Sequence, residues 1–129
     1  DAKALAALAS GGSVDMTATI LYNVALLHHR QGRDAEAARD HARSLELFER
    51  LLGEDHPKLT YPLEGLAQSR LRLGEFDEAL RMQERALAIR EAALGKDHPS
   101  LVYSLTGLGN IHRDRGRFDA ALAPGTRAL

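Results

Sequence analysis

The chain has 129 residues, of which 44% are hydrophobic and 27% are charged, values typical of a globular domain. Seventeen basic and eighteen acidic residues leave a net charge of −1, which argues against a dedicated binder of nucleic acids or membrane surfaces. The sequence contains no apolar run of about 18 residues and no cysteine, so we expect no transmembrane helix, no disulfide and no thiolate zinc site. Leu and Ala far outnumber Val and Ile, which favours helices over sheets.

The sequence repeats itself with a period of 42 residues. Residues 95–129 are identical to residues 53–87 at 17 of 35 positions, and residues 11–52 match residues 53–94 at 12 of 42 positions. A fixed period of this length indicates stacked units, each of which completes its core only against its neighbours. We therefore expect a single array made of four segments: the end of a preceding unit at 1–10, unit 1 at 11–52, unit 2 at 53–94, and an incomplete unit 3 at 95–129.

The apolar spacing in the middle unit predicts two helices joined by a short turn. Pro57 suits the first turn of a helix, Asp55 is placed to cap it, and Gly74 is expected to end it. The second helix is expected to start near Phe76 and to end at Gly95, and the short turn makes the two helices antiparallel. Across the chain, helices are predicted near 16–31, 34–52, 57–73, 76–94, 99–115 and 118–128, with a short helical stub near 2–9.

The recurring residues resemble the tetratricopeptide family, and specifically its 42-residue kinesin-light-chain-like form. The pattern is G-x-D-H-P, then L-x-x-L-[AG], then G-x-F-D-x-A-L, then R-A-L, and it is strong from residue 53 onward and moderate before. In the middle unit it stands at Gly53, Asp55, His56, Pro57, Leu63, Leu66, Ala67, Gly74, Phe76, Asp77, Ala79, Leu80, Arg85, Ala86 and Leu87. The resemblance implies an all-α, right-handed superhelical solenoid of about three antiparallel helix pairs, truncated at both ends. HEAT and armadillo repeats have a similar period, but the Gly and Ala pattern at the turn is closer to the tetratricopeptide one.

The resemblance also implies a function. The first helices of this family line a concave groove that binds a peptide segment or a partner domain, and the family implies no catalysis. Asn often stands on the groove face of the kinesin-light-chain-like form. Here Asn23 matches that position, whereas Gly65 and Gly107 replace it in the next two units. By their spacing, the first-helix residues expected in the groove are Tyr22, Asn23, Leu26, Arg30, Tyr61, Glu64, Gln68, Arg72, Tyr103, Thr106, Asn110, Arg113 and Asp114.

The histidines and the scattered Ser and Asp residues form no recognisable metal or catalytic motif. His56 and His98 recur at the repeat period, which is typical of a structural position, and the motifs H-E-x-x-H and G-x-S-x-G are absent. We therefore expect neither an enzyme, a metal site nor a cofactor. The expected partner is a protein or peptide, not nucleic acid or membrane, and the expected location is the cytoplasm.

Two alternative functions stay open. The array could be a structural spacer or a self-assembly module that associates through its exposed ends, since neither end shows a polar capping helix. It could also be a regulatory segment of a larger bacterial signalling protein. The absence of an initiator Met, the ends inside repeat units and an excess of Arg over Lys (14 to 3) suggest this second alternative.

Overall fold

The computed structural model describes residues 14–122, and every regular element in this range is helical. In chain order the elements are α2 (Val14–Arg30), α3 (Asp34–Leu52), the short 3-10 helix η1 (Pro57–Leu59), α4 (Thr60–Arg72), α5 (Phe76–Leu94) and α6 (Leu101–Leu122). The predicted all-α class is confirmed. The stub expected near 2–9 lies outside the described residues. None of the described helices is both long enough and apolar enough to cross a membrane.

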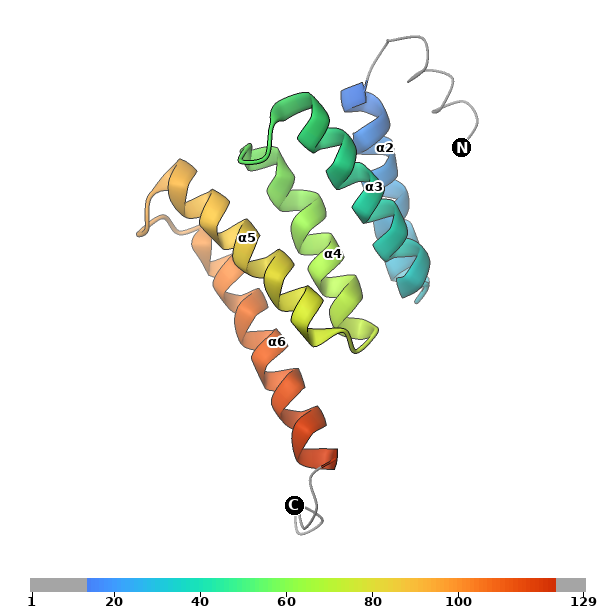
Figure 1. Cartoon of the computed structure of the whole chain (residues 1–129), viewed down its shortest axis with the longest axis vertical. Helices are drawn as coiled ribbons and strands as arrows, with labels where there is room; N and C mark the ends of the chain where they lie inside the picture. The colour runs from blue at the N-terminus through green and yellow to red at the C-terminus, as the bar shows by residue number, and fades with distance from the viewer. Residues whose placement is uncertain (1–13, 123–129) are drawn as a thin grey trace.

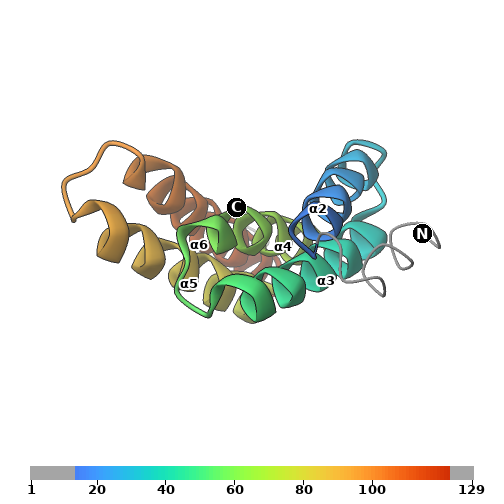
Figure 2. The same cartoon turned by 90° about the horizontal axis from the view of Figure 1, so that it is seen from above.

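The helices form a curved double layer in which each helix packs against the next along the chain (Figure 1). The first helices α2, α4 and α6 lie on the inner side of the curve, and the second helices α3 and α5 lie on the outer side (Figure 2). Within the inner layer, α4 also contacts both α2 and α6. This arrangement gives the first helices a shared concave face.

Two glycine turns set the antiparallel pairing of α2 with α3 and of α4 with α5. Gly32 and Gly74 have φ angles of +77° and +79°, which L side chains rarely adopt. The residue after each glycine donates its backbone N–H to the carbonyl five residues earlier, at 2.8 and 2.9 Å, and so satisfies the end of the first helix. Because both turns contain only three residues, the second helix has to run back along the first.

The apolar core lies between the two layers and continues from α2 to α5. Ala67 and Ala79 are buried where α4 packs on α5, as expected for small residues at a close helix contact. The main cluster of buried apolar residues comprises Ala18, Leu21, Ala38, Leu45, Leu47, Phe48, Leu59, Leu63, Leu66, Ala86 and Ile89. Because this cluster crosses the unit boundaries, each unit depends on its neighbour for a complete core.

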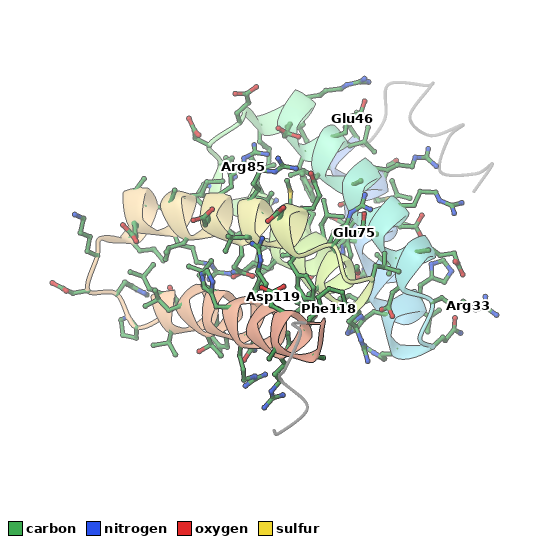
Figure 3. All side chains as sticks on the ribbon, turned by 60° about the horizontal axis from the view of Figure 1, so that its bottom comes forward. Arg33, Glu46, Glu75, Arg85, Phe118 and Asp119 are labelled. Atoms are coloured by element: carbon green, nitrogen blue, oxygen red, sulfur yellow. The ribbon has the colours of Figure 1, made fainter. Side chains whose placement is uncertain are left out.

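Polar contacts also join successive units. Arg85 of α5 donates hydrogen bonds to the Glu49 carboxylate at the end of α3 and to the Glu54 carbonyl, both at 2.9 Å (Figure 3). The buried Ser44 hydroxyl donates to the Ala18 carbonyl at 2.7 Å. These contacts complete polar groups that would otherwise be buried without partners at the helix interfaces.

The cap before α4 differs from the expectation. Asp55 is not the capping residue; instead, the His56 ring accepts a hydrogen bond from the Lys58 backbone N–H at 3.1 Å. The His98 ring accepts in the same way from the Ser100 N–H, also at 3.1 Å. The recurrence of His at this position is therefore structural, because its ring nitrogen takes the place of the expected carboxylate.

The predicted separate helices at 99–115 and 118–128 are wrong in the described range, because α6 is continuous through Gly116. Gly116 does not take the positive φ that Gly32 and Gly74 have at the same repeat position. A reversal needs a following helix that packs back along the first, whereas continuation keeps every backbone hydrogen bond. Continuation costs only the low helix propensity of Gly, about 1 kcal/mol.

Contacts with the start of α5 hold the extended part of α6 in place. The Phe118 ring lies beside the Phe76 ring, with the centroids 5.4 Å apart, and Arg115 pairs with Asp77 at 2.8 Å (Figure 3). As a result, Leu105 is 53% exposed, although Leu63, its equivalent one unit earlier, is completely buried. The period alone does not reveal this difference, because the buried surface depends on which helix packs back.

The first helix α2 exposes a stripe of large apolar side chains, namely Met16, Ile20, Val24 and Leu27. One repeat later, the positions of the last three are occupied by Pro62, Leu66 and Ser69, which are buried in the array. The stripe is therefore the kind of face that packs against another helix in the next unit. Self-association through the ends of the solenoid stays a prediction.

Candidate binding groove

The inner layer is hollowed at two places that are related by the repeat. The α2–α4 pocket, about 280 Å³, is lined by Thr19, Tyr22, Asn23, Phe48, Lys58 and Tyr61. The α4–α6 pocket, about 690 Å³, lies one unit further along and receives side chains from α4, α5 and α6. Tyr61 lines both pockets and is 58% exposed. The two pockets therefore form one continuous groove with Tyr61 at the boundary.

The groove brings together most of the residues that the sequence predicts for it. Those that line one or both pockets are Tyr22, Asn23, Tyr61, Glu64, Gln68, Tyr103, Thr106 and Asn110. Those that line neither pocket are Leu26, Arg30, Arg72, Arg113 and Asp114. A binding role stays a prediction for both groups, but only the first group shares a cavity.

The predicted residues outside the pockets include charged side chains that contact their own neighbours. Arg72 lies 3.2 Å from the His29 ring and 3.9 Å from the Asp34 carboxylate, and Arg113 lies 3.6 Å from Asp114. Exposed pairs of this kind typically contribute between 0 and about 1 kcal/mol. They lie toward the C-terminal ends of the inner helices rather than in the two hollows.

The carboxylate of Glu64 joins three helices in the wall of the α4–α6 pocket. Its Oε2 accepts hydrogen bonds from Gln83 Nε2 of α5 at 2.9 Å and from the Ser104 hydroxyl of α6 at 2.8 Å. Its Oε1 accepts from Arg90 of α5. Glu64 and Arg90 are 21% and 16% exposed, so the pair is largely shielded from water. Such charge-assisted networks fix side-chain positions strongly.

Gln83 and Arg90 are not among the residues that the sequence predicts for the groove. They belong to an outer helix, yet both line the α4–α6 pocket. Gly107 makes room for Gln83, because a Cβ at Gly107 would lie 2.6 Å from Gln83 Cδ. Gly65 makes room for His41 of α3 in the same way, because a Cβ there would overlap the His41 ring.

This exchange explains why glycine replaces the asparagine that the resemblance implies at residues 65 and 107. A polar side chain from the preceding outer helix fills the space that an inner-helix side chain would occupy. The signal is present in the sequence as a pairing at a fixed separation. His41 precedes Gly65 by 24 residues, and Gln83 precedes Gly107 by the same separation.

His41 lies between the two layers and is only 1% exposed. Its ring packs against the Tyr22 ring with the centroids 5.4 Å apart, and its Nδ1 has no hydrogen-bond partner. Burial lowers the pKa of His41 to about 4, and the nearby His29 lowers it further. Burial also raises the pKa of Tyr22, with the charges of Tyr61 and Glu64 adding to the effect. Both rings are therefore uncharged at neutral pH.

The family model of the tetratricopeptide repeat matches residues 16–92 and, in a second match, residues 59–129. The chain belongs to the tetratricopeptide repeat family. No curated protein matches it. In this tetratricopeptide array, the described residues include no group of three or more His, Asp or Glu side chains placed to hold a metal ion. What the tetratricopeptide groove offers a ligand is aromatic faces and hydrogen-bonding groups.

Replacing Gly65 by Ala is expected to lower the free energy of unfolding by about 1–3 kcal/mol. The added methyl group would overlap the buried His41 ring, and this overpacking outweighs the better helix propensity of Ala. Urea denaturation followed by circular dichroism measures the change. Gly109→Ala is the matched control, because nothing lies within 4 Å of a Cβ at Gly109, and it is expected to be neutral or stabilising. A Gly65→Ala variant as stable as the parent would contradict the contact.

Stability is expected to fall as the pH drops from about 6.5 toward 4. Below pH 6.5 the unfolded chain takes up a proton at His41, whereas the folded chain does so only near pH 4, so acid favours unfolding. His41→Gln, which places the residue of the next unit at this position, should show a smaller loss over the same range. Urea denaturation of both proteins at several pH values measures the difference. Identical pH dependence in the two proteins would show that His41 does not titrate in this way.

Proposed function

We propose that the chain is a protein-interaction module that holds an extended peptide segment of a partner protein in the groove of α2, α4 and α6. The observation that carries this proposal is the register of the two pockets with the repeat. An extended segment meets equivalent pockets at regular intervals along a solenoid, whereas a compact ligand would need only one. Tyr61, exposed at the boundary, is placed to contact the ligand on both sides.

Exposed aromatic rings support this use of the groove. Tyr103 is 74% exposed and lines the α4–α6 pocket at the position that Tyr61 occupies one unit earlier. Tyr is enriched among the residues that dominate binding energy, because a rigid ring buries a large area at little cost in conformational entropy. The Tyr22 ring meets the Tyr61 ring edge-on, with the centroids 6.1 Å apart, which helps to hold Tyr61 in position.

We further assign the array to the 42-residue, kinesin-light-chain-like form, with units at 11–52, 53–94 and 95–129. The four glycines with positive φ support this assignment, since Gly53 and Gly95 recur at the same separation as Gly32 and Gly74. The two family matches also begin about one unit apart, at residues 16 and 59. In this proposal the module acts by binding alone, without catalysis or cofactor, inside the cytoplasm.

A phage library of random peptides tests the groove, with the parent chain, Tyr61→Ser and Leu51→Ser as targets. Tyr61 and Leu51 are both large and exposed, but Leu51 lies on α3 outside both pockets. Peptides enriched on the parent should bind Tyr61→Ser at least about tenfold more weakly, equivalent to about 1.4 kcal/mol, and Leu51→Ser with unchanged affinity. Circular dichroism checks that both variants are folded.

Two outcomes would contradict the proposal. Equal binding by the parent and by Tyr61→Ser would place the ligand outside the groove. No enrichment on the parent would mean that the described groove does not hold a peptide by itself.

A further inference from the structure

The two pockets have equivalent positions but different chemistry. Tyr22 and Phe48 line the α2–α4 pocket, and the residues 42 positions later, Glu64 and Arg90, line the α4–α6 pocket. An aromatic pair in one unit is thus replaced by an ion pair in the next. This difference, which rests on the proposed function, gives the groove a polarity along its length.

The α2–α4 pocket suits a large apolar side chain. Phe48 belongs to the apolar core and turns an edge of it toward the pocket, while Tyr22 contributes a ring beside it. The one cationic group in the lining, Lys58, lies 3.5 Å from Asp15, so its charge is partly compensated. A pocket with aromatic walls and little net charge gains most from an aliphatic or aromatic ligand group.

The α4–α6 pocket disfavours a charged ligand group of either sign. Glu64 and Arg90 cancel each other's charge, and the two Glu64 oxygens already accept hydrogen bonds from three side chains. A cationic group would be repelled by Arg90 and would find the carboxylate fully engaged. An anionic group would be repelled by Glu64, and Arg90 would have to leave its partner to bind it.

The α4–α6 pocket nevertheless offers uncharged polar groups that a ligand can use. Gln68, Thr106 and Asn110 line it and make no side-chain hydrogen bond within the described part of the chain. The Arg90 Nε–H is buried without an acceptor. A neutral group that both donates and accepts hydrogen bonds matches this lining, and a side-chain amide is such a group. A purely apolar group would leave the polar groups desolvated and unpaired.

We propose that the groove selects a peptide that places a large apolar side chain in the α2–α4 pocket and the side-chain amide of Asn or Gln in the α4–α6 pocket. Neighbouring helices pack about 8–10 Å apart, and an extended chain advances about 3.3 Å per residue. The two ligand residues are therefore expected to be about two to four positions apart.

The experiment selects the same random peptide library on the parent and on variants of the second pocket. The double variant Glu64→Tyr/Arg90→Phe gives the α4–α6 pocket the residues of the α2–α4 pocket. The enriched motif should change from apolar plus amide to two apolar residues at the same spacing, with the preference for the amide reduced at least tenfold. Thr106→Val/Asn110→Leu, which leaves the Glu64 network intact, should also lose the amide preference and carries the test if the first variant does not fold.

The matched control is Glu46→Tyr/Arg50→Phe. It removes another Glu–Arg pair, exposed on α3 and outside both pockets, and should leave the motif unchanged (Figure 3). An amide preference that survives in both pocket variants would overturn its assignment to the α4–α6 pocket. A motif with a charged residue at that position, still lost in Tyr61→Ser, would overturn the inference and leave the proposed function standing. Enrichment that does not depend on Tyr61 would contradict the proposed function itself.

Discussion

The contact between an inner-helix glycine and a polar side chain of the preceding outer helix determines how this groove is built. At Gly65 and Gly107 the missing side chain lets His41 and Gln83 pass between two inner helices. The close approach of the units and the chemistry of the groove thus have the same cause. A solenoid usually presents its inner helices to a ligand, but here the outer helix α5 also contributes Gln83 and Arg90 to the pocket lining.

This construction explains how two units with the same backbone differ in chemistry. In the first pocket the outer helix contributes Phe48, which belongs to the apolar core, and in the second it contributes Arg90, which requires Glu64 as a partner. A buried charge without a partner would cost several kcal/mol, so the two residues have to change together. The repeat therefore preserves shape while paired substitutions change polarity from one unit to the next.

Much of the fold could be predicted from the sequence, because period, glycine turns and apolar spacing act locally. Gly32 and Gly74 end their helices as expected, whereas Gly116 does not, since a reversal there depends on packing by a later segment. Most of the residues that line the pockets were predictable from their place on a first helix. Gln83 and Arg90 were not, because an outer helix reaches the groove only where a glycine opens the way, and helical periodicity does not describe gaps between helices.

A double-mutant cycle on Gly107 and Gln83 tests the central claim most directly. In the parent, Gln83 is nearly buried and bonded to Glu64, so it cannot move away from a new methyl group at residue 107 without losing that bond. Gly107→Ala should therefore be destabilising in the parent but neutral or stabilising in the Gln83→Ala background. The coupling between the two sites, measured from urea denaturation, should reach about 1 kcal/mol or more. A coupling near zero would show that the glycine and the outer-helix side chain do not share this space.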